Sequence, residues 1–419
     1  MVLDRAVGVA SRWLRLDVEY YSRATAYLVL GQVCVALSSL AASMLFVRLS
    51  SQDIYGQYNY VLSVLGLLSI LSLPGMSTAM ARSVARGYDQ VFVRGVRTRL
   101  TWGLLGSVVA LTIGLYYIVV KGSTTLGGSF IIASLIFPLF VAGDSYNALL
   151  NGRREFCRLS LYQAASAVVG GAGVTVGVYS FPNNLLGIVA LSLASYAGIH
   201  GVFLWRTFRR PLNRESEDGS LGFGRHMTVQ GTVDTVAQYS DKIVVGLLLT
   251  FSELAVYSIA LTVMLVEKVV YLPLVPMFPR LAQLEERVAF REVRRRLPLG
   301  MLGFGLACGV AALAAQVLIP LVYTAKYSAS VPYAQLLILS VFLGAPCQVV
   351  VQLFKSQRRV GDLYRLTTST AAIQIVLTTA LVLPFGLAGV VWARVAVQAI
   401  RSGIAWVLLV RSRSPSAVS

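Results

Sequence analysis

Long apolar blocks, each separated from the next by a short polar stretch, recur along the whole chain. About 20 apolar residues in a helix cross the hydrocarbon core of a bilayer, and several of these blocks reach that length. Inside lipid the backbone polar groups must bond within their own segment, which a helix achieves. Only 13% of the residues are charged, against about 25% in soluble domains. The sequence therefore predicts an all-α polytopic membrane protein.

Twelve blocks are long enough to span the membrane. They lie near 27–47, 57–80, 100–120, 128–150, 162–181, 185–205, 227–249, 254–277, 299–320, 333–354, 366–384 and 388–410. A hydrophilic linker, 206–226, divides them into an N-terminal six-helix lobe, 26–205, and a C-terminal one, 227–410. Because each lobe has an even number of helices, both enter the membrane in the same orientation. We therefore expect parallel repeats related by an axis along the membrane normal.

The basic residues predict the orientation of these helices. The termini and the loops on their side of the membrane hold 29 Lys and Arg residues, and the loops on the other side hold only Arg48, Lys121 and Lys326. By the positive-inside rule both termini are cytoplasmic. Residues 1–25 are predicted as an interfacial amphipathic helix and 411–419 as a cytoplasmic tail. A net charge of +18 spread over alternate loops, rather than over one face, argues against a nucleic-acid partner.

The seventh block carries a polar stripe. Its sequence, MTVQGTVDTVAQYSDKIVVGLLLT (227–250), holds five polar or charged residues at helical spacing: Gln230, Asp234, Gln238, Asp241 and Lys242. These positions share one side of a helix. Lipid cannot solvate such a stripe, so we expect it to face a protein interior or a watery path.

Eight ionisable residues fall inside predicted spans: Asp144, Asp234, Asp241, Glu267, Lys242, Lys268, Arg394 and Arg401. Each costs about 2.5–3.5 kcal/mol near a helix centre, so we expect pairing between the four acids and the four bases. Depth counted from the turn near Thr250 predicts a contact between Asp234 and Lys268. The pairs could be purely structural, and Asp144 could simply hydrogen-bond locally, but the length of the stripe favours a functional role.

Five motifs along the chain resemble a known family. They are YGQYNYVLSVLGLLSILSLPGMSTAMARSVARG (55–87), LLNGRREF (149–156), DKIVVGLLLTFSELAVYSIA (241–260), YTAKYSASVPYAQLLILS (323–340) and FGLAGVVWARV (385–395). In this order they are similar to Wzx-type polysaccharide (O-antigen) flippases of the multidrug/oligosaccharidyl-lipid/polysaccharide exporter superfamily. The resemblance implies two lobes that open alternately around a central cavity. The implied substrate is an undecaprenyl- or dolichyl-diphosphate-linked oligosaccharide, moved from the cytoplasmic to the external leaflet.

The chemistry of the buried residues then suggests their roles. Four cations are predicted to bind the anionic headgroup: Lys242, Lys268, Arg394 and Arg401. Three amides are predicted to contact the glycan: Gln230, Gln238 and Gln398. Four acids are predicted to balance charge or to couple transport to an ion gradient: Asp144, Asp234, Asp241 and Glu267. No metal and no cofactor are expected, and the coupling ion is left open between H⁺ and Na⁺.

Two other functions stay open. A cation-exporting multidrug or metabolite antiporter of the same superfamily would favour an acidic, aromatic cavity, whereas charge is balanced here. A membrane glycan polymerase or ligase would place its chemistry on a long external loop, and no predicted external loop exceeds ordinary connection length. We therefore predict a multi-pass cytoplasmic-membrane transporter and not an enzyme, with the bilayer and the lipid-linked oligosaccharide as partners. A glycan polymerase and glycosyltransferases are left open as protein partners.

Overall fold

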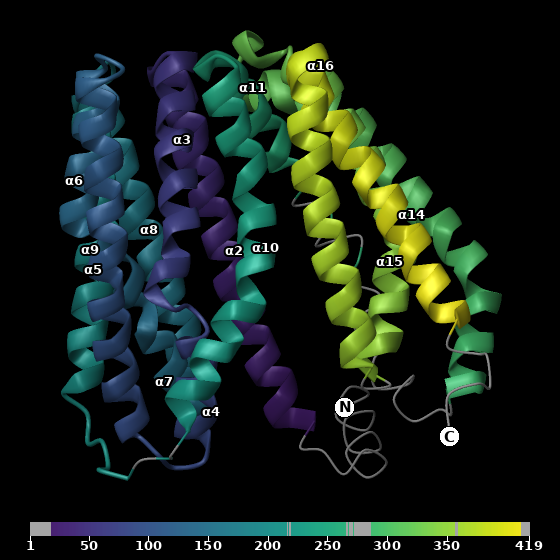
Figure 1. Cartoon of the computed structure of the whole chain (residues 1–419), viewed down its shortest axis with the longest axis horizontal. Helices are drawn as coiled ribbons and strands as arrows, with labels where there is room; N and C mark the ends of the chain where they lie inside the picture. Colours follow the sequence, from purple (N-terminus) through teal and green to yellow (C-terminus); the bar gives the residue numbers. More distant parts are fainter. Residues whose placement is uncertain are drawn as a thin grey trace, which may run out of the picture. The chain divides into compact units, whose positions relative to one another are not determined.

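The computed structural model describes residues 18–215, 217, 219–264, 267, 271, 286–356 and 359–411. The regular structure in these residues is helical throughout (Figure 1). The helices are α2 (Val18–Leu49), α3 (Gln52–Leu68), η1 (Ser69–Ser72), α4 (Met76–Ala85), α5 (Gln90–Val119), α6 (Thr124–Ala142), η2 (Gly143–Ser145), α7 (Tyr146–Gly152), α8 (Phe156–Ser180), α9 (Leu185–Phe208), α10 (Ser220–Leu248), α11 (Phe251–Thr262), α14 (Glu286–Tyr323), η4 (Ala325–Tyr327), α15 (Ser330–Ser356) and α16 (Val360–Arg411).

Nine stretches of the described residues are long and apolar enough to cross a membrane. The last of these, Gly361–Leu408, holds two predicted spans, because Gly386 adopts a non-helical conformation (φ 55°) that divides α16 into two helices. The predicted span 227–249 corresponds to α10, and α11 begins the predicted span 254–277, much of which lies outside the described residues. The prediction of an all-α polytopic membrane protein is confirmed.

The first described helix begins earlier than predicted. The sequence assigns residues 1–25 to a separate interfacial helix, whereas α2 already begins at Val18 and runs without interruption to Leu49. The last part of the predicted interfacial segment is therefore continuous with the first spanning helix. Residues 1–17 and the tail from 412 onward lie outside the described residues.

The chain divides into two compact units, which do not coincide with two contiguous halves. Unit 1 comprises residues 1–50 and 68–231, and unit 2 comprises 51–67 and 232–419. The predicted lobes, 26–205 and 227–410, differ from these units because α3 groups with the C-terminal helices. The chain therefore passes from one unit to the other three times, and α10 belongs to unit 1 up to Gly231 and to unit 2 beyond it.

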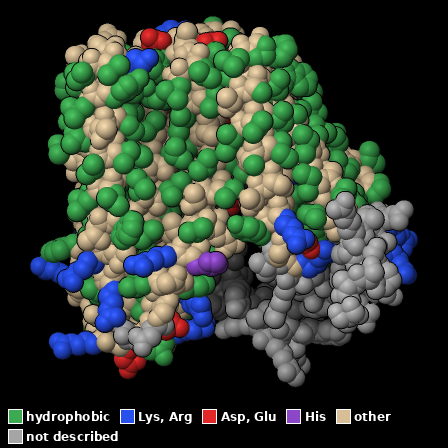
Figure 2. All heavy atoms as spheres, in the orientation of Figure 1, with side chains coloured by type: hydrophobic (Ala, Val, Ile, Leu, Met, Phe, Trp, Pro, Cys, Tyr) green, Lys and Arg blue, Asp and Glu red, His purple; other side chains and the backbone are tan. Residues whose placement is uncertain are grey.

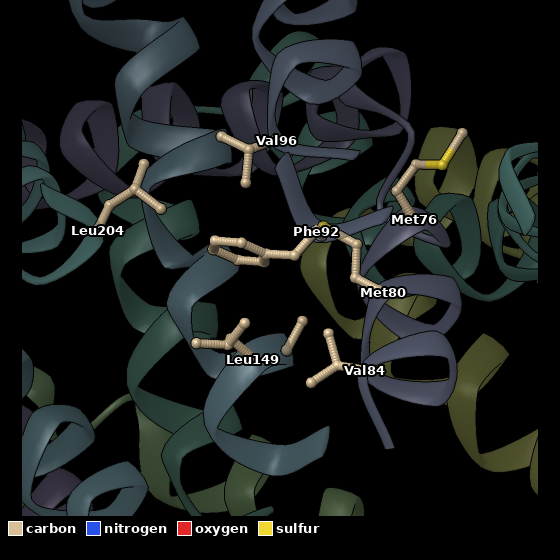
Figure 3. Close-up of a cluster of buried hydrophobic side chains, with 8 residues drawn as sticks. Met76, Met80, Val84, Phe92, Val96, Leu149 and Leu204 are labelled. Carbon is tan, nitrogen blue, oxygen red and sulfur yellow. The ribbon is translucent and has the colours of Figure 1, made fainter. Parts of the chain in front are cut away.

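Unit 1 is a helical bundle with a dense apolar centre near one end. Its α5 packs on α6, α8 packs on both α2 and α9, and α4 packs on α7. A cluster of buried side chains joins α4, α5, α7 and α9, as Figure 3 shows. It consists of Met76, Met80, Val84, Phe92, Val96, Ala148, Leu149 and Leu204. Burial of these side chains fixes the helix ends that carry the loops at this end of the unit.

The connection between α9 and α10 is bound to this end of unit 1. Arg153 donates to Asp89 at 2.7 Å and to the carbonyl of Pro211, so the linker lies against two loops at once. Farther along, Glu217 accepts from Ser83 and from Arg86, both at 2.6 Å. The segment 206–226, predicted as a linker, is therefore held against the rest of unit 1 by hydrogen bonds and an ion pair.

Glu155, in the turn between α7 and α8, belongs to the same network. It accepts hydrogen bonds from Arg210 and Arg158, each at 2.8 Å. Burial alone would raise the pKa of Glu155, but these two guanidinium groups outweigh it, so the pKa lies below its ordinary value. The carboxylate is therefore held ionised at neutral pH.

We call this the basic end of unit 1, after the Arg side chains that gather there. In Figure 2, drawn in the orientation of Figure 1, most Lys and Arg side chains of unit 1 lie at the lower ends of its helices, below a largely hydrophobic surface. The helices of unit 1 expose large apolar side chains such as Leu104 and Leu135, which are 57% and 79% exposed. A hydrophobic belt bounded by charged ends is expected of helices that cross a bilayer.

In unit 2, α3 packs closely on α10 and α11. A Cβ atom at Gly56 would lie 1.8 Å from the carbonyl oxygen of Phe251, and one at Gly66 would lie 2.4 Å from the ring of Tyr239. Glycine at these positions lets the helices approach at backbone distance. A hydrogen bond from Ser252 to Asp53 adds a polar contact at the end of this packing. Elsewhere in the unit, α15 packs on α14, α11 and α16.

Candidate functional site in the membrane-spanning helices

The polar stripe of α10 is divided between buried and exposed positions. Gln230, Asp234 and Gln238 keep part of their surface accessible on their own units, whereas Asp241 is only 2% exposed. Gln230 precedes the boundary between the units at Gly231, and the other three follow it. The three exposed residues of the stripe are therefore followed by a buried carboxylate, Asp241, inside unit 2.

Asp241 lies at the centre of a charged cluster. Arg394, from the second half of α16, donates to its Oδ2 at 2.7 Å, and the hydroxyl of Tyr257 donates to the same oxygen at 2.5 Å. The backbone N–H of Lys242 donates to Oδ1 at 2.8 Å. Both carboxylate oxygens are thus satisfied, which an ionised carboxylate requires at this depth.

A tight turn between α10 and α11 aligns this cluster. Thr250 caps α11: its side chain accepts from the backbone N–H of Glu253, whose carboxylate in turn accepts from the Thr250 backbone. Asp241 and Tyr257 lie at similar distances before and after this turn, so the antiparallel helices bring them to one level. The capping box therefore determines which residues of the hairpin face each other.

A second polar group lies about two helical turns from Arg394 along α16. Arg401 lies beside the thiol of Cys347, and its buried Nε has no hydrogen-bond partner among the described residues. Gln398 approaches α15 where Gly344 leaves room, since a Cβ there would lie 3.0 Å from the amide oxygen. Arg394, Gln398 and Arg401 thus lie on the face of α16 that meets the other helices of unit 2.

Glu267 is a second acid near Arg394. Its carboxylate interacts with both Arg394 and Tyr271, and the hydroxyl of Tyr271 donates to the carbonyl of Val341. The predicted contact between Asp234 and Lys268 lies outside the described residues, because Lys268 is not among them. Among the residues that the structure describes, Asp241 is paired with Arg394 instead.

Asp144, the remaining predicted acid, lies in unit 1. It accepts from Arg99 at 2.7 Å, and Arg99 also donates to Ser145 and Ser77. The predicted span 100–120 begins one residue after Arg99, whereas the structure places Arg99 within α5, where it is 4% exposed. The structure therefore adds an ion pair to the local hydrogen bonding predicted for Asp144.

Tyr257 is the main member of the cluster that the sequence did not single out. A tyrosine in an apolar block carries no charge signal, and it becomes recognisable only when the turn at Thr250 is used to place it opposite Asp241. Its side chain is fully buried.

Comparison with known proteins identifies the family. The family model described as "Polysaccharide biosynthesis protein" matches residues 22–285, more than half of the chain. The chain belongs to this polysaccharide biosynthesis protein family. A sequence comparison with curated proteins finds no match. The predicted resemblance to polysaccharide flippases is confirmed at the level of family and superfamily fold.

Solved structures show the fold of this polysaccharide biosynthesis protein. An inward-facing multidrug resistance MATE family transporter of the MOP superfamily superposes with a TM-score of 0.68 at 15% identity, covering 91% of this chain and 96% of that one. The MATE multidrug transporter DinF-BH gives 0.61 at 17% identity, covering 96% and 97%. A MOP superfamily transporter from Pyrococcus furiosus Vc1 gives 0.55 at 14% identity, covering 94% and 95%.

These matches cover nearly the full length of both chains, so the fold is MATE-like from end to end. The family and the fold together identify a multi-pass membrane protein of polysaccharide biosynthesis with a MATE-like fold.

Proposed function

We propose that this protein is a flippase for an isoprenoid-diphosphate-linked oligosaccharide. It moves the substrate from the cytoplasmic to the external leaflet by alternating access, for the synthesis of a surface polysaccharide. The observation that carries the proposal is the pair of arginines on one face of α16, Arg394 and Arg401, inside the membrane-spanning part of a polysaccharide biosynthesis protein. A diphosphate must shed water inside the protein, and guanidinium groups replace that hydration with bidentate hydrogen bonds.

The other polar residues complete the proposed roles. Headgroup binding is assigned to Lys242, Lys268, Arg394 and Arg401; glycan contact to Gln230, Gln238 and Gln398; and charge balance or ion coupling to Asp144, Asp234, Asp241 and Glu267. In the empty site Asp241 neutralises Arg394 at 2.7 Å. A diphosphate that takes over Arg394 releases the Asp241 carboxylate, which is then available to a coupling cation. Substrate binding and cation binding are thereby linked.

The direction of transport rests on the distribution of charge. The 29-to-3 asymmetry of Lys and Arg between alternate loops supports cytoplasmic termini and a cytoplasmic basic end in a cell membrane. The ion pairs of Asp89, Arg153 and Glu155 then lie on the cytoplasmic side, where glycans are assembled on their lipid.

Deletion and complementation test the proposal. Loss of the protein is expected to abolish the surface polysaccharide and to accumulate lipid-linked oligosaccharide on the cytoplasmic leaflet. Arg401→Ala should fail to restore the polysaccharide at normal protein levels, whereas Arg209→Ala, which removes an exposed arginine stacked on Trp205 at the basic end, should restore it. Full restoration by Arg401→Ala and Lys268→Ala would overturn the headgroup assignment. Normal polysaccharide in the deletion strain, with drug sensitivity in a pump-deficient host, would support an antiporter instead.

A further inference from the structure

A row of three carboxamides crosses unit 1 outside the cluster already described. Gln32 on α2 donates through Nε2 to Oε1 of Gln163 on α8, and Gln163 donates through its own Nε2 to Oδ1 of Asn147 on α7. Both donor–acceptor distances are 3.4 Å, beyond the usual range of about 2.7–3.2 Å for an N–H···O bond. The row is therefore loosely bonded along its length.

The row lies at membrane depth. Gln32, Gln163 and Asn147 each fall within a stretch apolar enough to span, about 8–10 Å from the end of that stretch at the basic end. Gln32 is exposed on the unit, and Gln163 and Asn147 are half-buried. Amides at this depth cannot face hydrocarbon without a large cost, so the row faces water or a polar ligand.

Asp144 extends the row by one residue. It precedes Asn147 by three positions, which places both on one side of the segment η2–α7. Arg99 holds its Oδ1 at 2.7 Å, whereas Oδ2 accepts no hydrogen bond from the described residues, and the side chain is 44% exposed. The row thus ends in the carboxylate of Asp144. Arg99 holds its Oδ1, and its Oδ2 is available to accept a hydrogen bond from a ligand.

The donors and acceptors of this row match one class of ligand. A sugar hydroxyl both donates and accepts, as a carboxamide does, and neighbouring hydroxyls pair well with a carboxylate and an amide side by side. A diphosphate would need free cations, but Arg99 is buried behind Asp144 and already bonded to it. A hard metal ion would need several anionic oxygens, and this row offers a single carboxylate.

We propose that Gln32, Gln163, Asn147 and Asp144 form a subsite for a neutral sugar of the transported glycan, near the basic end of unit 1. This subsite rests on the proposed function, because only a transporter of lipid-linked glycans brings sugars to this depth. It is separate from the headgroup residues, which all belong to the C-terminal half of the sequence.

Ligand-detected NMR on the full-length protein in lipid nanodiscs tests the subsite. The probes are free glucose, galactose, mannose, rhamnose and N-acetylglucosamine, each at millimolar concentration, and inorganic pyrophosphate as a separate anionic probe. We expect saturation transfer to at least one sugar, reduced at least about fivefold in Gln163→Leu and Asn147→Leu, because each variant removes both a donor and an acceptor. Broadening of the pyrophosphate signal should be unchanged in both variants.

Ser38→Ala is the matched control. Ser38 also joins α2 to α8, by a 2.8 Å hydrogen bond to the carbonyl of Ala167, but lies outside the row. It should leave the sugar signal intact, so that a loss confined to the amide variants is not a packing defect. Equal sugar signals in wild type and Gln163→Leu, or no signal from any sugar, would overturn the subsite. The deletion phenotype described above would be unaffected by that result, so failure of the subsite is distinguishable from failure of the flippase proposal.

Discussion

At the scale of single residues, the pair of Asp241 and Arg394 is held by the densest set of hydrogen bonds in the candidate site. Asp241 has three donors within hydrogen-bond distance, and its side chain is 3% exposed. Breaking such a pair by neutralising one partner leaves an uncompensated charge in a medium that solvates it poorly. The cost should therefore depend on whether one charge or both are removed.

We predict that Asp241→Asn destabilises the protein by about 3–5 kcal/mol. The double variant Asp241→Asn/Arg394→Gln should cost less than the sum of the two single variants, because neither charge is left alone. Thermal unfolding of the purified proteins in one detergent measures both quantities. Strictly additive effects would contradict a direct pair.

A second residue-level prediction concerns Glu155 and pH. Because its pKa in the folded protein is lowered, its ion pairs stabilise the fold above the pKa of the unfolded chain and are lost as pH falls through the folded value. Glu155→Gln should therefore cost about 1 kcal/mol at neutral pH and nearly nothing in acid. The measurement is the difference in thermal midpoint from wild type at several pH values. Glu215→Gln, which removes an exposed carboxylate from the same connection, is the matched control.

At the scale of elements, the interrupted helix α3–η1–α4 shows what hydropathy can and cannot predict. The apolar block 57–80 predicts a span, and the structure has helices there. It does not predict that Leu73 takes a left-handed conformation (φ 55°) at the end of η1. That break depends on packing across the sequence, since Gly75 lies against Thr228 of α10, 153 positions away.

Gly75 permits this close approach of α4 to α10. A Cβ at this position would lie 2.3 Å from the backbone nitrogen of Thr228 and 2.6 Å from the carbonyl oxygen of Gly224. Gly75→Ala should therefore separate the two helices and cost about 1–3 kcal/mol. Gly222→Ala, also on α10 but with nothing within 4 Å of the new atom, should be neutral or stabilising by up to about 1 kcal/mol. Equal thermal midpoints for the two variants would contradict this packing.

In the candidate site, too, the sequence pattern predicted which residues matter but not which of them are in contact. Helical spacing was enough to select the α10 stripe, and the structure places Arg394, Gln398 and Arg401 on one face of α16. The ion pair of Asp241 and Arg394 was not predictable from spacing, because the two residues are 153 positions apart. Counting depth along each helix does not show which helices are neighbours, so it does not choose between possible partners. Arg99 falls just outside the predicted span 100–120, although it is buried by contacts with η2 and α4.

At the scale of the whole molecule, orientation in the membrane is the most direct test of the charge pattern. In a protein whose four cysteines are replaced by alanine, Asn183→Cys should react with a membrane-impermeant maleimide in intact cells. Glu215→Cys should react only after permeabilisation. Asn183 lies in the exposed turn before α9, and Glu215 lies on the fastened connection at the basic end. The opposite labelling pattern would invert the proposed direction of transport.

The chain crosses between its two units three times, and this affects how the protein folds during its own synthesis. Helix α3 is made early, but its partners in unit 2, the second half of α10 and the start of α11, follow about 170–200 residues later. At a synthesis rate of about 5–20 residues per second, α3 waits roughly 10–40 s in the bilayer before its glycines meet their neighbours. Unit 1 is likewise incomplete until the first turns of α10 emerge. The protein therefore cannot fold one half after the other, and a nascent chain stopped before α10 holds two sets of unsatisfied helices at once.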